Sequence, residues 1–105
     1  MHLTKDDDGK TVSVTQGDEV VISLDENPTT GYVWAIDKID DTILALKSSD
    51  YSADAPIPGS GGTRTLTFTT KQAGTSPLQL KDWRSWEGDT SVIGRFGVTI
   101  TVTGS

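Results

Sequence analysis

Residues 98–102 read VTITV, a strict alternation of aliphatic side chains with threonine. Successive side chains of an extended strand point to opposite faces, so this pattern places all three aliphatic residues on one face. Residues 65–69, TLTFT, show the same period of two. Threonine also favours the extended conformation because it is branched at Cβ. Both stretches therefore predict half-buried β-strands.

The same period recurs outward from these two stretches along most of the chain. Further strands are predicted at residues 11–14, 20–24, 32–36, 43–47 and 78–80. We expect the first two of these to form a hairpin around the turn at residues 16–18. The glycine-containing turn at residues 73–75 is expected to turn the strand at 65–69 back. Trp34, in the middle of its strand, is predicted to belong to the core.

About seven to eight short strands in 105 residues predict an all-β immunoglobulin-like β-sandwich. The chain contains no cysteine, so this sandwich has no disulfide, and a thiolate metal site or cysteine nucleophile is excluded. We find no internal repeat or linker, and residues 1–105 are expected to form a single domain.

Charge and hydropathy restrict the partners. The net charge of -6 repels phosphate backbones, so nucleic acid is not an expected partner. No apolar run approaches the roughly 20 residues of a membrane span, and residues 1–8 lack the apolar segment of a signal peptide. We expect a soluble chain without a membrane partner, and a monomer. The compartment stays open, because an exported or lysosomal protein can have lost its signal peptide.

The first departure from the strand pattern is the loop at residues 27–32, NPTTGY. Pro28 fixes its own φ and biases Asn27 toward an extended geometry, while Gly31 permits a positive φ. The result is a stiff tip that carries Thr29 and Thr30, which lose little conformational freedom on binding. The alternative is a loop whose Asn and Thr side chains only satisfy their own backbone.

A second loop covers residues 56–63, PIPGSGGT. It lacks the Gly-Lys-[Ser/Thr] of a phosphate-binding loop, and a strand rather than a helix follows it. Its backbone, poor in side chains, can instead pair with an extended peptide or with the backbone of another protein. A flexible connector is the alternative.

A third loop covers residues 81–88, KDWRSWEG. Tryptophan and arginine are the residue types most enriched at binding hot spots. Trp83 continues an alternating strand and can face inward, whereas Trp86 lies beyond Arg84 and is the better candidate for an exposed anchor.

The residues needed for catalysis or metal binding are scarce. The single histidine, His2, lies at the terminus. A Ser-His-Asp triad therefore has no convincing base, and a histidine metal site has no convincing ligand. The acidic runs at residues 6–8 and 40–41 have the character of solvated surface. We therefore predict a binding protein without cofactor rather than an enzyme. A carbohydrate-binding or adhesion β-sandwich module is the alternative, and a glycosidase-like carboxylate pair is the weakest one.

The order NPTTGY at 27–32, GSGGT at 59–63 and WRSW at 83–86, on an all-β chain without cysteine, resembles the chagasin family of protein inhibitors of papain-like cysteine proteases. The resemblance extends over most of the chain. The third motif departs from the family pattern, because Ser85 stands where the family usually has proline between arginine and tryptophan.

The resemblance implies an immunoglobulin-like fold that presents three loops as a wedge across the protease cleft. Thr29 is then nearest the catalytic cysteine and histidine, with Thr30 supporting it, and Trp86 with Arg84 packs on the primed side. The implied function is reversible, competitive inhibition of a papain-like cysteine protease. The implied protease-binding residues are Asn27, Pro28, Thr29, Thr30, Gly31, Tyr32, Gly59, Ser60, Gly61, Gly62, Thr63, Arg84, Ser85 and Trp86.

Overall fold

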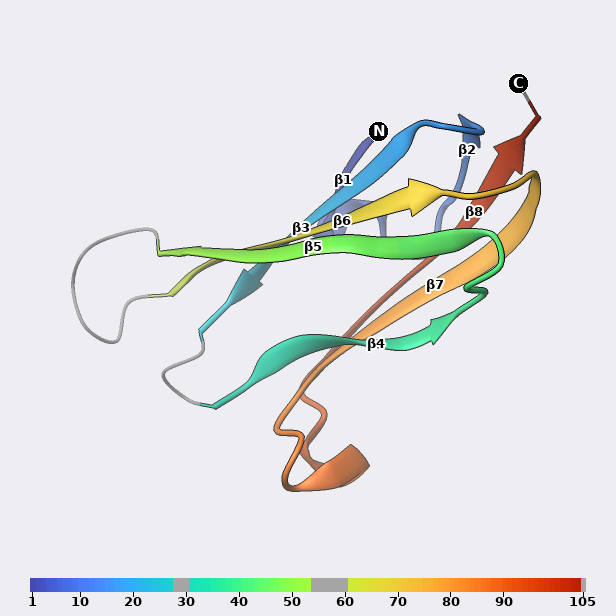
Figure 1. Cartoon of the computed structure of the whole chain (residues 1–105). Helices are drawn as coiled ribbons and strands as arrows, with labels where there is room; N and C mark the ends of the chain where they lie inside the picture. Colours follow the sequence, from blue (N-terminus) through green and yellow to red (C-terminus); the bar gives the residue numbers. More distant parts are fainter. Residues whose placement is uncertain (28–30, 54–60, 105) are drawn as a thin grey trace.

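The computed structural model describes residues 1–27, 31–53 and 61–104, in which two four-stranded β-sheets face each other (Figure 1). The strands of the first sheet, in spatial order, are β1 (His2–Thr4), β3 (Glu19–Glu26), β6 (Gly62–Thr70) and β5 (Leu44–Ala53). Those of the second are β2 (Thr11–Thr15), β8 (Gly94–Thr103), β7 (Gly74–Trp83) and β4 (Val33–Ile39). The described helical segments are the short 3-10 helices η1 (Lys5–Asp7) and η3 (Gly88–Ser91). No helix in the described part of the chain has the length and apolar character to cross a bilayer.

The core lies between the two sheets and is built from alternate positions of their strands. Along β3 the side chains of Val20, Ile22 and Leu24 are buried, and the residues between them are more exposed. In β8 the three aliphatic residues at 98, 100 and 102 are buried as well. The other buried apolar residues of the core are Leu3, Val14, Ile43, Leu44, Leu66, Phe68, Leu78, Leu80 and Phe96. The strands predicted from alternation at 20–24, 65–69, 78–80 and 98–102 are therefore confirmed.

The predicted hairpin of residues 11–14 with 20–24 is wrong. β2 pairs in parallel with β8 of the second sheet, whereas β3 pairs with β1 and β6 of the first. The turn at residues 16–18 thus carries the chain from one sheet to the other. Gly17 adopts a φ of +98° in this turn, and its N–H donates to Oγ1 of Thr70 at 2.8 Å. Alternation records which side chains face the core but not which strand is the neighbour, so both arrangements have the same pattern.

The chain reverses near the predicted position, but the turn lies at residues 71–73, because Gly74 and Thr75 already belong to β7. This turn also joins the two sheets. β6 has β3 and β5 as neighbours, and β7 has β4 and β8. Gly74 adopts a φ of +147°, and a Cβ added there would lie 2.7 Å from Cδ1 of Ile43. The strands predicted at 43–47 and 32–36 are found as β5 and β4, which begin one residue later than predicted and continue to Ala53 and Ile39.

Strand ends of both sheets gather at one end of the sandwich, at the left and lower left of Figure 1. The ends of β3 and β5 both lie opposite Gly62, the first residue of β6. In the second sheet, β4 begins opposite Trp83, the last residue of β7, and β8 begins opposite Asp82. All three loops that the sequence singled out therefore leave and re-enter the sandwich at the same end.

Candidate functional site

The candidate site is the loop end of the sandwich, with loop 1 (residues 27–32), loop 2 (residues 54–61) and loop 3 (residues 84–93) between the strands. Gly62 and Thr63, predicted as loop, belong to β6, and residues 81–83 belong to β7. The predicted site residues that the structure describes are Asn27, Gly31, Tyr32, Gly61, Gly62, Thr63, Arg84, Ser85 and Trp86. The predictions for Pro28, Thr29, Thr30, Gly59 and Ser60 lie outside the described residues.

Loops 1 and 3 contact each other directly. Gly31 has a φ of +86°, and a Cβ added there would lie 2.7 Å from the Cη2 atom of Trp86. Beside this contact, the guanidinium of Arg84 stacks on the ring of Tyr32, 4.4 Å from its centroid. Such stacking of a cation on an aromatic face is favourable and fixes the orientation of both groups. The structure therefore brings together four residues that the sequence predicted for the site in two separate loops.

Loop 3 is held closed by a buried serine that the sequence analysis missed. Oγ of Ser91 accepts a hydrogen bond from the Arg84 N–H at 3.0 Å and lies 2.7 Å from the carbonyl oxygen of Gly88. Arg84 also forms an ion pair with Glu87, with 3.0 Å between Nη1 and Oε1. No sequence pattern marks Ser91, because its role depends on the path of the loop.

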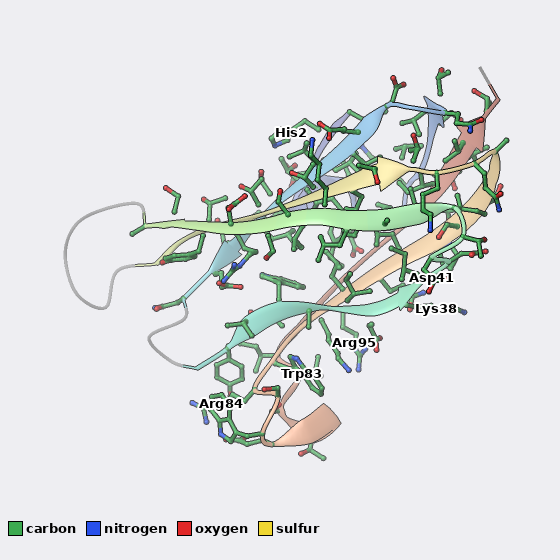
Figure 2. The ribbon with its side chains drawn as sticks, viewed as in Figure 1. His2, Lys38, Asp41, Trp83, Arg84 and Arg95 are labelled. Carbon is green, nitrogen blue, oxygen red and sulfur yellow. The ribbon has the colours of Figure 1, made fainter. Side chains whose placement is uncertain are left out.

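Trp86 is exposed and Trp83 lies on the outer face of its sheet. Trp86 exposes 70% of its surface, in agreement with its selection as the exposed candidate. The suggestion that Trp83 faces inward is wrong, because the inward positions of β7 continue through Leu80 to Asp82. Trp83 instead shares the outer face with Lys81, whose Nζ lies 3.7 Å from the ring centroid. Figure 2 shows Trp83 and Arg84 at the end of β7, beside the η3 turn.

Trp34 packs against the core as predicted, although it is only partly buried. Its indole N–H donates to the backbone oxygen of Asp25 at 2.8 Å. This bond matters for the site, because Asp25 precedes loop 1 and Trp34 follows it. Trp34 is thus a core residue that also joins the two stems of loop 1.

The two glycines of the second motif differ in their surroundings. A Cβ at Gly62 would collide with the backbone oxygen of Ser52 and with the ring of Tyr51. A Cβ at Gly61 would meet only the backbone oxygen of Glu26, at an ordinary contact distance of 3.6 Å. Packing of the first sheet therefore requires glycine at 62 but not at 61.

An open hollow of about 320 Å³ lies between the stems of loops 1 and 2, lined by Asp25, Glu26, Asn27, Gly61 and Gly62. The carboxylate beneath it, that of Glu26, has no exposed surface and pairs with Arg64 at 2.7 Å between Oε1 and Nη2. The sequence analysis missed Glu26, although a signal was present. It continues the inward series Val20, Ile22 and Leu24 of β3, and an acidic residue at an inward position is unusual.

A second carboxyl group, that of Asp82, lies near Glu26 at the base of the loops. Burial raises the pKa of Asp82, and the charge of Glu26 raises it further. Oδ1 of Asp82 is buried and has no hydrogen-bond partner among the described residues. The described residues contain no group of three or more His, Cys, Asp or Glu side chains placed to hold a metal ion.

Comparison with known proteins assigns this architecture to a family. The family model described as "Chagasin family peptidase inhibitor I42" matches residues 13–100. The chain belongs to the chagasin family. Chagasin of Trypanosoma cruzi is 32% identical over 101 residues, which cover 91% of this chain and 92% of chagasin. The resemblance indicated by the three motifs is therefore confirmed, as is the prediction of an inhibitor rather than an enzyme.

Solved structures share the fold of this chagasin-family chain. The cysteine protease inhibitor EhICP2 of Entamoeba histolytica matches with a TM-score of 0.86 and 24% identity, over 97% of this chain and 94% of EhICP2. PbICP-C, solved in complex with falcipain-2, matches with a TM-score of 0.65 and 17% identity, over 98% of this chain and 90% of PbICP-C. The predicted immunoglobulin-like β-sandwich is confirmed. Family membership also favours the inhibitor prediction over the carbohydrate-binding and adhesion alternatives.

Proposed function

We propose that this protein is a reversible, competitive inhibitor of papain-like cysteine proteases that blocks the active-site cleft with loops 1, 2 and 3. The observation that carries the proposal is the joint arrangement of loops 1 and 3. Gly31 lies against the exposed ring of Trp86, and Arg84 stacks on Tyr32. Membership of a family of peptidase inhibitors supplies the class of target.

The energetic role of loop 3 follows from its exposed tryptophan. A large aromatic side chain that becomes desolvated in a complex is a typical hot spot. Trp86 is exposed, and the loop that carries it is braced by Ser91 and by the Arg84–Glu87 ion pair. Little ordering entropy then remains to be lost on binding. Trp86 is the anchor on the primed side of the cleft, and Arg84 holds its loop against loop 1.

Loop 1 enters the catalytic centre, with Thr29 nearest the cysteine and histidine and Thr30 supporting it. Cleavage requires the thiolate to reach a carbonyl carbon in near-attack geometry while the oxyanion donors receive its oxygen. A stiff loop that presents threonine side chains fills the site without offering that geometry. Asn27, Pro28 and Gly31 supply the stiffness.

Loop 2 pairs with the protease through its backbone on the non-primed side, in the manner of an added strand. Gly59, Ser60 and Gly61 lead into β6, where Gly62 and Thr63 continue the contact. Glycine at 61 serves this role rather than the fold, because a Cβ there would make only an ordinary contact, 3.6 Å from the backbone oxygen of Glu26.

The test is a titration of the protein into papain while hydrolysis of a peptide substrate is followed. We expect the apparent KM to rise with no change in the maximal rate, and full activity to return after dilution. Trypsin is the control protease, and its activity should be unaffected. Unchanged papain activity at micromolar inhibitor, or loss of activity that dilution does not reverse, would contradict the proposal.

A further inference from the structure

Loop 1 connects strands that belong to different sheets. β3 enters it from the first sheet and β4 leaves it in the second. Among the described residues, no ladder of backbone hydrogen bonds therefore joins the two stems of this loop. In loop 2, by contrast, the flanking strands β5 and β6 pair with each other. Something other than sheet pairing must set the distance between the stems of loop 1.

The carboxylate of Glu26 supplies that connection. Glu26 is the last residue of β3, and its Oε2 accepts the backbone N–H of Trp34, in β4, at 2.8 Å. Because Glu26 is immediately before the loop and Trp34 comes soon after it, this one bond spans the loop. The bond from the Trp34 indole to Asp25 runs beside it.

The same carboxylate reaches the stems of loop 2. Nη2 of Arg64 donates to Oε1 of Glu26 at 2.7 Å, and Nε lies 3.1 Å from both carboxylate oxygens. Arg64 belongs to β6, which follows loop 2. Its guanidinium also contacts β5, which precedes loop 2, through the Oγ of Ser49 at 3.2 Å and the ring of Tyr51 at 5.7 Å from the centroid. The stems of loops 1 and 2 are therefore joined at one buried carboxylate.

Because Glu26 is buried, the bonds to its carboxylate are costly to break. The Glu26 side chain has no exposed surface, and a buried charge is tolerated only when it is paired and hydrogen-bonded. Each stem can shift only by giving up a bond to this charge. A surface ion pair such as Lys47–Glu19, at the other end of β3, has no comparable constraint.

We propose that Glu26 is a positioning residue that sets the placement of loop 1 relative to loop 2, and thereby determines how well the inhibitor fits the cleft. The expected effect on inhibition rests on the proposed function. The placement of the two loops by Glu26 does not. Glu26 itself lies beneath the loops, so it acts through them rather than by touching the protease.

The test compares Glu26→Ala and Glu26→Gln with a matched buried polar variant, Thr70→Val. Thr70 also ties a turn, accepting from the Gly17 N–H and donating to the Asp18 oxygen, both at 2.8 Å, but at the opposite end of β6. All three variants are expected to lower the melting temperature. At 25 °C, where circular dichroism verifies that each is folded, the inhibition constant for papain is measured.

We expect Glu26→Ala to weaken inhibition at least tenfold, and Thr70→Val to change it by less than twofold. Glu26→Gln should fall between them, since one of the two carboxylate oxygens becomes an NH2 group, which cannot accept the bond from the Trp34 N–H or from Nη2 of Arg64. Inhibition by both Glu26 variants within twofold of the wild type would overturn the inference. If Glu26→Ala does not fold, Glu26→Gln decides alone by the same criterion.

Amide hydrogen exchange separates this inference from the proposed function. We expect Glu26→Gln to accelerate exchange at Tyr32 and at residues 61–63, and to leave residues 11–20 unchanged. If wild-type protein fails to inhibit papain, the proposed function is wrong, and faster exchange at both stems still supports the positioning role. Unaltered exchange at residues 61–63 would overturn it whatever the inhibition result.

Discussion

At the scale of single residues, Trp86 and Trp34 have opposite roles. Trp86→Ala removes an exposed side chain, so we expect inhibition of papain to weaken by about 2 kcal/mol, or roughly 30-fold, with the melting temperature almost unchanged. Trp34→Ala removes a ring that packs on the core and should cost about 3 kcal/mol of unfolding free energy. Inhibition assays and thermal melts on both variants check this. An unfolded Trp86→Ala protein would place Trp86 in the core instead.

The pair Gly61 and Gly62 separates folding from binding. Gly62→Ala forces a Cβ into the backbone of Ser52 and should lower the unfolding free energy by about 1–3 kcal/mol. Gly61→Ala meets only an ordinary contact and should stay within about 0.5 kcal/mol of the wild type. Urea denaturation measures both. The expectation fails if the two variants are destabilised equally.

Asp82 should make stability depend on pH. Burial, and then the charge of Glu26, raise its pKa in the folded protein above the value of the unfolded chain. The folded state therefore binds the proton more tightly, and this contribution to stability is complete below pH 3.8 and is lost as the pH rises through the raised pKa. Asp82→Asn cannot ionise, so we expect it to be more stable than the wild type at pH 7, with a smaller difference at pH 4.

Urea denaturation of the wild type and of Asp82→Asn at pH 4, 5.5 and 7 measures this difference. The comparison cancels the carboxyl groups common to both proteins, including Asp7 and Asp40, whose pKa values hydrogen bonds lower. Asp50→Asn, at an exposed position of β5, is the matched control for the loss of one carboxylate from the chain. If the difference in unfolding free energy between Asp82→Asn and the wild type does not change with pH, the Asp82 carboxyl keeps one protonation state over this range and the prediction is wrong.

At the scale of elements, loop 3 is shaped by its own bonds rather than by proline. The Ser85 N–H has no acceptor among the described residues, so proline removes no hydrogen bond there. Ser85→Pro should restrict the unbound loop and favour the bound geometry by roughly 0.4–1 kcal/mol, or about two- to fivefold tighter inhibition. The gain should appear as slower dissociation from papain. Faster dissociation would mean that this loop follows a path of its own that proline disrupts.

At the scale of the whole molecule, one core serves both sheets, and β2 and β3 place consecutive segments on opposite sides of it. Neither sheet can be exposed without losing the apolar contacts of the other. We therefore expect cooperative, two-state unfolding of the chain as one domain.

Two spectroscopic probes test this expectation. All three tryptophans lie in or beside the loop-end elements, so their fluorescence reports unfolding of that end, whereas far-ultraviolet circular dichroism reports unfolding of all strands. Coincident transitions are expected, and an earlier fluorescence transition would show separate melting of the loop end.

The sequence by itself determined the strand class, the inward-facing apolar residues of the alternating strands and the family. Alternation such as that of residues 98–102 is a local property of extended chain, and the three motifs lie within short segments, so both are readable without coordinates. The exposure of Trp86 was also predictable, because it lies beyond the strand and after an arginine.

Only the tertiary structure decided which strands are neighbours and what connects the loops. Residues 11–14 and 20–24 alternate in the same way whether they pair with each other or lie in different sheets. The pattern therefore could not distinguish the predicted hairpin from the arrangement that the structure has. Trp83 faces outward because Asp82 takes the inward position at the end of β7. Glu26 binds Trp34 and Arg64 through bonds between segments 8 and 38 residues apart in the chain. Such contacts arise from the closure of two sheets around a shared core, which no local stretch of sequence encodes.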